Sequence, residues 1–368
     1  MDKTARREFF SRCVCCESPT AFRGEGLSRR NLLTGGAAIM GLGLAAGGFP
    51  AIAQTPAAGA AKPRRIDVHH HIIPPVQAAA FTRHHLRPSK WSVEGSLTDM
   101  DKAGITTAIT SIQNPGVWFG EAGEESRKLA RDCNEYAAKL AGDHPGRFRS
   151  FAAIPLPDTD GSLREIEYAL DVLKAEGIAL WTNYTGKYLG DAAFVPVFEE
   201  LNRRKAVIYT HPTGSTCCVD MIKGVSEGTV ETGTETTRTI ASLLFGDGGT
   251  AARFPDIRFI WSHSGGTMPF LISRFEQQTK AKPDPRLPNG PVPLLQKFYY
   301  EVAQGNTPGQ LAALLKLVPI AQVMYGSDYP YRPGVEAVDG VDTYPFTVAE
   351  RRAIDSENAI RVMPNLKA

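Results

Sequence analysis

Three consecutive histidines, His69 to His71, stand at the end of a short apolar run and are followed closely by two prolines. The prolines rule out continuation as a central strand or helix, so the run predicts a buried strand that ends in a loop. Because side chains alternate along a strand, Asp67, His69 and His71 are expected on one face and His70 on the other. Two imidazoles spaced in this way can reach one metal ion, and Asp67 can hold a ring N–H. A surface triplet or a tag remnant is the alternative, which the internal, apolar setting disfavours.

Three other polar residues that could do chemistry follow later strands: His211 in Thr-His-Pro, His263 in Ser-His-Ser-Gly-Gly, and Asp328 in Gly-Ser-Asp-Tyr-Pro. A single histidine at a strand end is usually a hydrogen-bonded core residue. If the strands close into a barrel, however, their carboxyl ends meet in one mouth. His69, His71, His211 and Asp328 would then form a nitrogen and oxygen ligand set that suits zinc, manganese or iron.

The elements that must position these residues alternate along the chain. Predicted strands cover 65–71, 107–112, 149–154, 178–183, 207–211, 258–263, 298–303 and 322–328. Predicted helices cover 96–103, 124–141, 161–175, 192–204, 234–252, 268–278, 308–316 and 347–360. Eight β-then-α units of this total length predict an α/β fold of the (β/α)8 TIM barrel type. A doubly wound sheet is the alternative, but no glycine-rich phosphate motif follows the first strand.

The chain divides into three segments at the level of sequence. Residues 1–53 have the pattern of a twin-arginine signal peptide, with Arg29 and Arg30 before a Gly/Ala-rich apolar run and a small-x-small site near Ala53. A membrane anchor is the alternative, but the run is short for the roughly 20 apolar residues that a span needs. Residues 54–63 form a Pro/Ala-rich linker, and 64–368 the barrel. We expect a periplasmic or secreted protein with no membrane contact after cleavage.

The amino-acid composition gives no sign of a nucleic-acid partner. The 368 residues carry 41 Lys+Arg and 39 Asp+Glu, a net charge of +2, whereas nucleic-acid-binding domains are usually strongly basic. Six cysteines include a vicinal pair, Cys217 and Cys218, and three in the predicted signal segment, so no disulfide framework is implied.

Taken together, the motifs resemble the amidohydrolase superfamily, within it the branch of aminocarboxymuconate-semialdehyde decarboxylase and of salicylate-type and resorcylate-type decarboxylases. Segments near Tyr188 and Phe194 are most similar to the 6-methylsalicylate decarboxylase-like group. The motifs that carry the resemblance are Ile66 to Pro74, Thr210-His211-Pro212, Ser262 to Phe270, Tyr325 to Pro330 and Asn358-Ala359.

The resemblance implies roles for individual residues. His69, His71, His211 and Asp328 would bind one divalent metal, zinc or else manganese, and His263 would be a general acid/base beside it. Strand four ends in Trp-Thr-Asn without the lysine that bridges two metals in binuclear members, so a single metal is expected. Arg274 matches an arginine that reaches a neighbouring subunit's substrate, which implies a homodimer or higher homo-oligomer. A helix-surface charge is the alternative for Arg274.

Three functions remain open from the sequence. The first is a carboxy-lyase for an aromatic or unsaturated carboxylic acid, in which Asp328 or His263 protonates the carbon that loses CO2. The second is a lactone or ester hydrolase on the same scaffold, with Asp328 as the base. A non-catalytic metal or solute binder would not need His263. Candidate walls of the substrate pocket are Trp91, Trp118, Trp181 and Tyr329, and the loop 72–96 is a candidate lid.

Overall fold

The computed structural model describes residues 64–184, 186–214 and 222–367. The predicted signal peptide (1–53) and linker (54–63) lie outside these ranges, as do Cys217 and Cys218. Cys133, which is buried on a helix, is a free thiol. None of the helices in the described ranges is long and apolar enough to span a membrane.

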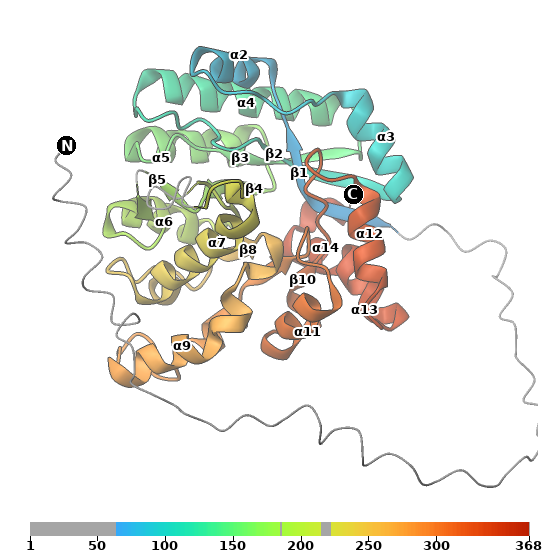
Figure 1. Cartoon of the computed structure of the whole chain (residues 1–368). Coiled ribbons are helices and arrows are strands. Elements are labelled where there is room, and N and C mark those ends of the chain that lie inside the picture. Colours follow the sequence, from blue (N-terminus) through green and yellow to red (C-terminus); the bar gives the residue numbers. More distant parts are fainter. Residues whose placement is uncertain (1–63, 185, 215–221, 368) are drawn as a thin grey trace, which may run out of the picture. The chain divides into compact units, whose positions relative to one another are not determined.

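Eight parallel strands run in chain order around one sheet, which confirms each predicted strand and the (β/α)8 barrel (Figure 1). Every strand is short, and the first two are the longest. Their bounds are β1 (Arg65–Ile72), β2 (Ile105–Ile112), β3 (Phe148–Ala153), β4 (Gly177–Trp181), β7 (Val207–His211), β8 (Arg258–Trp261), β9 (Tyr299–Glu301) and β10 (Val323–Met324). A small antiparallel hairpin that the sequence did not predict, β5 (Asn183–Tyr184) with β6 (Lys187–Tyr188), follows β4.

The barrel closes where β1 meets the residues that follow β10. The amide of Val68 donates to Tyr325 O at 3.1 Å, and the amide of His71 donates to Tyr329 O at 2.7 Å. Between them the amide of Asp328 donates to His69 O at 2.8 Å. Closure of the sheet therefore brings Asp328 against the first histidine of β1.

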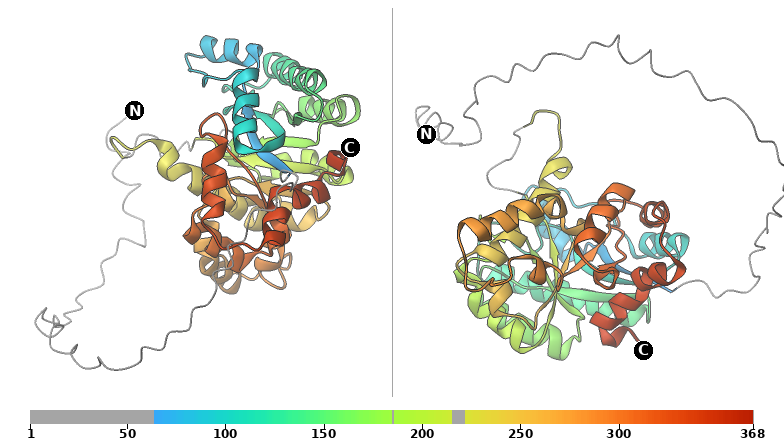
Figure 2. Two further views of the ribbon diagram at one scale, coloured as in Figure 1. Left: turned by 90° about the vertical axis from the view of Figure 1, so that its right-hand side faces the viewer. Right: turned by 90° about the horizontal axis from the view of Figure 1, so that it is seen from below.

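Helices lie around the central strands (Figure 2, right view). Their bounds are α2 (Pro75–Arg83), α3 (Val93–Ala103), α4 (Glu124–Asp143), α5 (Thr159–Glu167), α6 (Val195–Arg203), α7 (Glu227–Phe245), α8 (Thr250–Arg253), α9 (Met268–Ala281), α10 (Val292–Leu295), α11 (Pro308–Leu317), α12 (Gly334–Asp342), α13 (Val348–Arg352) and α14 (Asn358–Val362). Local signals explain several ends. Ser92 caps α3, and Gly104 ends it in the left-handed conformation at φ 66°.

The structure corrects three of the predicted boundaries. The predicted 72–96 loop contains α2, because Pro75 at the first helical position precedes a run of good helix formers. Residues 73–74 and 84–92 of that loop remain outside helices and strands. The helix predicted over 234–252 begins earlier, at Glu227, and is broken at residues 246–249, three of which are glycine. The region predicted as one helix over 347–360 comprises α13, a π-helical turn and α14.

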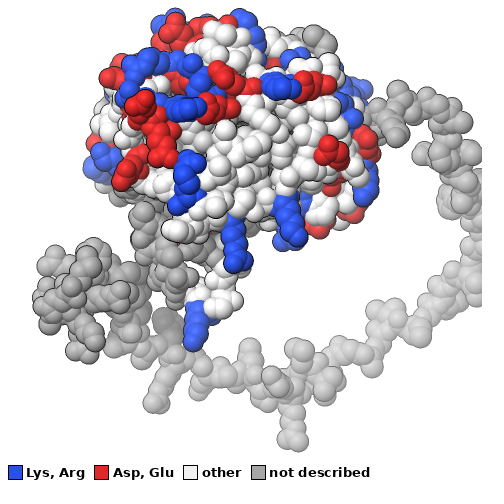
Figure 3. Space-filling view, turned by 90° about the horizontal axis from the view of Figure 1, so that it is seen from above, with Lys and Arg blue, Asp and Glu red and all other residues white. Residues whose placement is uncertain are grey.

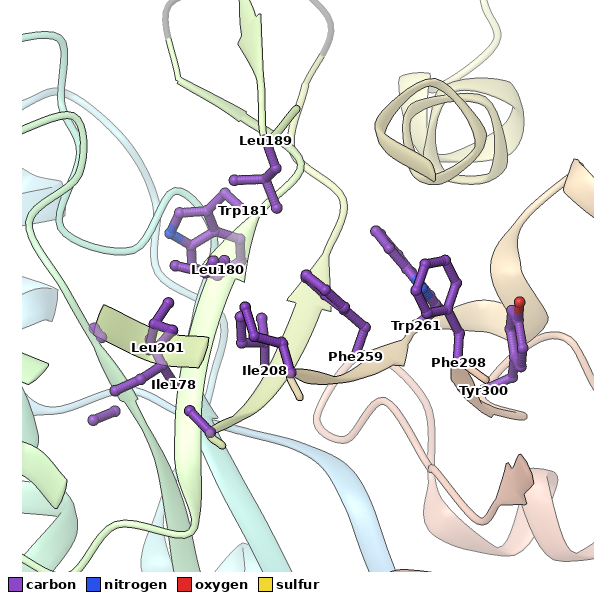
Figure 4. Packing of buried hydrophobic residues seen from close by; sticks show 14 of the residues in the cluster. Ile178, Leu180, Trp181, Leu189, Leu201, Ile208, Phe259, Trp261, Phe298 and Tyr300 are labelled. Atoms are coloured by element: carbon purple, nitrogen blue, oxygen red, sulfur yellow. The ribbon is translucent and has the colours of Figure 1, made fainter. Parts of the chain in front are cut away.

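Two apolar layers hold the barrel together. The outer layer packs the outward side chains of the strands against the helices; Figure 4 shows part of it, with Ile178, Ile208 and Phe259 on three neighbouring strands. The inner layer fills the barrel, where Phe151 stacks on Tyr209 at 5.3 Å between ring centres. Burial of such side chains contributes about 1.5–3 kcal/mol each.

The C-terminal segment closes the floor of the barrel. Val362, Met363 and Leu366 belong to the same buried cluster as Val68 and Phe151 inside the barrel. Arg258, at the start of β8, donates to Val362 O at 2.9 Å. The barrel is thus sealed at one end, and access to its interior is left to the opposite, carboxyl end of the strands.

The surface carries mixed charge. On the face shown in Figure 3, acidic and basic side chains are interspersed along one side, and the centre is largely uncharged. This face has no extended basic patch of the kind that binds a nucleic-acid backbone.

Candidate metal centre and active site

The carboxyl ends of β1 and β7 and the segment that follows β10 bring four predicted ligands together. One ligand atom from each of His69, His71, His211 and Asp328 lies within 4.8 Å of the others, and all four are buried inside the mouth. Nε2 of His71 lies 3.0 Å from Nε2 of His69 and 3.2 Å from Nε2 of His211. The sequence-based expectation that distant strand ends converge is therefore met in the described residues.

Each of these rings is oriented through its other nitrogen. Nδ1 of His211 lies 2.7 Å from Pro212 O, and a carbonyl oxygen can only accept, so this nitrogen carries the proton. Nδ1 of His69 faces the carboxylate of Glu301 at 2.8 Å, and Nδ1 of His71 faces Ser111 Oγ at 3.2 Å. A proton on Nδ1 of His211, required by Pro212 O, and on Nδ1 of His69, facing the Glu301 carboxylate, leaves Nε2 of each ring for a metal ion. Ser111 Oγ can accept from Nδ1 of His71 in the same way.

The carboxylate of Asp328 completes the set. Its Oδ1 lies 3.1 Å from Nε2 of His69 and 3.3 Å from Nε2 of His71, and no donor in the described residues is aimed at it along a hydrogen-bonding line. Its Oδ2 accepts a hydrogen bond from the side-chain Nε2 of Gln304. Oδ1 of Asp328 is thus buried, accepts no hydrogen bond from the described part of the chain and lies close to ring nitrogens of the three histidines. A divalent cation between these atoms would satisfy all of them, whereas protons could not.

Electrostatics at the cluster also favours a cation. Burial alone would lower the pKa of His69, but the charges of Glu301 and Asp328 raise it to about 10. Burial lowers the pKa of His211 well below its usual value, and the neighbouring rings of His71 and His69 lower it further. Burial would raise the pKa of Asp328, yet the charge of His69 brings it well below its usual value. The site thus combines an ionised carboxylate, Asp328, with a neutral ring, His211, and the two carboxylates that raise the pKa of His69 create a negative field that a bound cation would balance.

His263 lies beside the cluster without belonging to the four-ligand set. Its ring centre is 5.0 Å from that of His69 and 5.8 Å from that of His211. Nδ1 of His263 lies 2.9 Å from Ala303 O, so Nδ1 carries a proton and Nε2 is the nitrogen left for chemistry. A positioned imidazole next to a metal site is suited to general acid/base catalysis.

The sequence predicted that Asp67 would hold the ring of a ligand histidine, and the structure shows a different partner. Asp67 contacts His70, with Oδ2 3.1 Å from Nδ1, and Glu301 holds His69 instead. The cause is a register shift in β1 between Asp67 and His70, which interrupts the alternation of faces. Val68 and His69 both face the barrel interior as a result, and Asp67 lies with His70 on the outer face.

Glu301 is the functional candidate that sequence reasoning missed. It is fully buried at the end of β9, although it lies in the apolar sequence Tyr-Tyr-Glu-Val-Ala. A lone charged residue inside a buried strand is a signal that could have found it, because carboxylates are rarely buried without partners.

The predicted aromatic walls separate into two groups. The Trp181 ring lies 5.5 Å from that of His211, beside the ligand cluster. Tyr329 stacks on His70 at 4.7 Å, and Trp91 donates to Ser96 Oγ at 2.9 Å, so both lie on the outer face of β1. Tyr331, which was not predicted, has its ring 5.5 Å from that of His71.

The remaining two predicted residues lie away from the cluster. Trp118 is half-buried against the apolar core. Arg274 is exposed on α9 and has no hydrogen-bond or ion-pair partner among the described residues of the chain. Its predicted role toward a neighbouring subunit stays a prediction.

Comparisons with known proteins agree with this geometry. A model of the amidohydrolase family matches residues 66–364. The decarboxylase yanB of Aspergillus niger is 36% identical over 328 residues, which cover 82% of this chain and 88% of that protein. The 6-methylsalicylic acid decarboxylase of Penicillium expansum is 33% identical over 317 residues, which cover 82% of this chain and 97% of that protein.

A solved structure shares the fold. A dihydroxybenzoic acid decarboxylase from a Polaromonas species, with bound manganese and the inhibitor 2-nitroresorcinol, matches with a TM-score of 0.69 and 21% identity. The match covers 83% of this chain and 98% of that one.

Proposed function

Because this chain belongs to the amidohydrolase family, we propose that it is a metal-dependent decarboxylase that releases CO2 from a small aromatic carboxylic acid. The observation that carries the proposal is the set of four facing ligand atoms with His263 beside it. Support for decarboxylation in particular comes from relatives of 33% and 36% identity that carry decarboxylase names. Within that class, we propose a 2-hydroxybenzoate of the 6-methylsalicylate type as substrate.

The metal would be held by His69, His71, His211 and Asp328. When bound, a divalent cation supplies a Lewis acid for the oxygen atoms of the substrate. We propose zinc, because three imidazoles and one carboxylate suit it, with manganese as the alternative. The metal content of the protein as isolated tests this choice.

His263 would supply the proton. In the reaction, the bond between the ring carbon and the carboxyl carbon breaks, its electron pair stays with the ring carbon, and CO2 leaves. The ring carbon then takes one proton, which we assign to Nε2 of His263, and solvent restores it. The contacts of Asp328 support this choice over Asp328 itself, since its two oxygens face ligand nitrogens and Gln304, and its pKa is low.

CO2 release from salicylate, 6-methylsalicylate and 2,6-dihydroxybenzoate, measured beside hydrolysis of aryl esters and lactones, tests the function. We expect CO2 from at least one acid, and loss of that activity after a chelator removes the metal. Ester or lactone hydrolysis without CO2 release would assign the chain to the hydrolases instead.

We also propose a homodimer. Four large apolar side chains are exposed on and before α7 and at the start of α9: Ile222 (56%), Val225 (42%), Val230 (46%) and Phe270 (62%). The N-terminal part of α7 projects from the barrel in both views of Figure 2. Arg274 lies one helical turn after Phe270, so the same contact would carry it toward a neighbouring mouth. Phe270→Glu is expected to give a monomer in sedimentation, and an unchanged mass would contradict this surface.

Export through the twin-arginine route is the last part of the proposal. Replacement of Arg29 and Arg30 by lysine is expected to retain the protein in the cytoplasm, which cell fractionation measures. Equal periplasmic amounts of both forms would contradict this route.

A further inference from the structure

Glu301 connects two parts of the site that have different tasks. Its Oε1 lies 2.8 Å from Nδ1 of the predicted ligand His69, and the same oxygen accepts the backbone N–H of His263 at 2.8 Å. Its Oε2 accepts the backbone N–H of Ala303 at 2.7 Å. Three donors therefore converge on one fully buried carboxylate.

We propose that Glu301 is a positioning residue that couples the metal site to the proton donor. One oxygen fixes the ring of a metal ligand and also the main chain that carries His263. Displacement of this carboxylate must therefore disturb metal binding and proton transfer together. The metal half of this inference stands on geometry alone, and the half concerning turnover rests on the proposed function.

The backbone at His263 has an unfavourable conformation that the contact with Glu301 helps to hold. His263 and Ser264 both adopt left-handed conformations, with φ of 52° and 56°, which side chains other than glycine rarely occupy. The end of β9 holds this turn at three points. Besides the Glu301 contact, Ala303 O faces Nδ1 of His263, and Ser264 Oγ donates to Gly305 O at 2.8 Å.

The chemistry of the contacts requires a carboxylate. A carboxylate accepts at both oxygens, whereas a glutamine amide offers one acceptor and one donor group. In Glu301→Gln the amide nitrogen must face either Ala303 N–H or the pair of His69 and His263 donors. Either orientation leaves at least one buried donor facing another donor, although the side-chain volume hardly changes.

The neighbouring strand leaves room for this carboxylate. A Cβ atom added at Gly326 would lie 2.0 Å from Oε2 of Glu301 and 3.0 Å from Cβ of His69. Gly326→Ala therefore displaces Glu301 without altering its chemistry, with a smaller displacement at Cβ of His69. It gives a second way to test the inference should Glu301→Gln not fold.

Glu165 provides a matched control. It is also a buried glutamate with several donors, accepting from Asn134 Nδ2 at 2.8 Å and from Arg131 Nε at 3.0 Å. It lies on α5 and contacts none of the predicted ligands. Glu165→Gln thus reproduces the loss of a buried carboxylate without touching the site.

The experiment measures Mn²⁺ affinity by competition with a chelator, and kcat and KM at saturating Mn²⁺. For Glu301→Gln and Gly326→Ala we expect metal affinity to fall about 10–100-fold, the usual effect of losing a partner of a ligand histidine. We also expect kcat to fall at least about 10-fold while KM changes less, because His263 is displaced. Glu165→Gln should leave both values near those of the parent.

A double variant separates coupling from general damage. In a His263→Asn background, Glu301→Gln should weaken Mn²⁺ binding as before and produce no further fall in kcat. Parental Mn²⁺ affinity in Glu301→Gln, or an equal fall in kcat in both backgrounds, would overturn the inference. A parent protein that binds Mn²⁺ but releases no CO2 would contradict the proposed function only, since the difference in metal affinity between the Glu301 and Glu165 variants still decides the metal half.

Discussion

The two faces of β1 carry the same residue type with opposite outcomes. On the outer face, both ring nitrogens of His70 have partners: Nδ1 lies 3.1 Å from Asp67 Oδ2, and Nε2 lies 3.0 Å from Ser96 Oγ. On the inner face, His69 and His71 are equally buried, and their Nδ1 atoms face Glu301 and Ser111. Their Nε2 atoms instead face each other at 3.0 Å and share one oxygen of Asp328, at 3.1 and 3.3 Å.

Burial and residue type alone therefore do not distinguish a candidate metal ligand from a structural histidine. All three histidines of β1 are fully buried and adjacent in sequence. The difference is whether both ring nitrogens have a hydrogen-bond partner or whether Nε2 is left available to bind a metal ion. His70 satisfies both nitrogens, so we interpret it as a structural residue that ties β1 to α3.

Removal of an inner ligand should have the largest effect. We expect His211→Ala to lose the metal and nearly all activity, because one of the three imidazole donors that would hold the cation is removed. Metal content after dialysis and CO2 release measure the two losses. Equal metal content in variant and parent would remove His211 from the ligand set.

His263→Asn should have the second largest effect and a different signature. Asparagine tolerates the left-handed backbone at this position better than most residues, so the fold is expected to persist. We expect parental metal content and a fall in kcat of about 10²–10⁴-fold, the scale of positioned acid/base catalysis. Turnover close to the parental value would show that another group moves the proton.

His70→Leu should lower the stability of the protein, through the outer face of β1, without reducing metal binding at the inner face. The variant removes two buried hydrogen bonds, so we expect about 1–3 kcal/mol of lost stability, measured as a lower denaturant midpoint. Metal content should stay parental. Metal loss in this variant would mean that the two faces of β1 are not separate in function.

Ser96→Ala should have the smallest effect and sharpens the contrast. Ser96 Oγ contacts Nε2 of His70 and accepts from Nε1 of Trp91 at 2.9 Å. We expect a loss of about 1 kcal/mol in unfolding free energy, with parental metal content and kcat. A loss as large as that of His70→Leu would indicate that the outer contacts act as one unit.

Much of the fold and of the ligand set follows from local sequence. Each predicted strand ends in a polar residue or a turn, and parallel strands in a barrel present these ends at one mouth. Convergence of His69, His71, His211 and Asp328 was therefore predictable without knowledge of any contact. Helix α2 was missed because its short apolar run looked like part of a loop.

Which carboxylate hydrogen-bonds which histidine ring was not predictable in this way. The register shift in β1 depends on how the strand pairs with β2, and it reversed the expected face of Asp67. The link from Glu301 to His69 joins residues 232 positions apart, and nothing local specifies it. Such pairings depend on barrel closure, which sequence spacing alone does not resolve.

Closure of β1 by residues that follow β10 has a consequence for biosynthesis. The strand that carries two of the predicted ligands leaves the ribosome early, whereas Asp328 and the floor segment ending near Leu366 emerge last. A nascent chain arrested before Asp328 exposes an open sheet edge and lacks the anionic donor. We therefore expect a metal ion to bind this set only after synthesis of the polypeptide is complete.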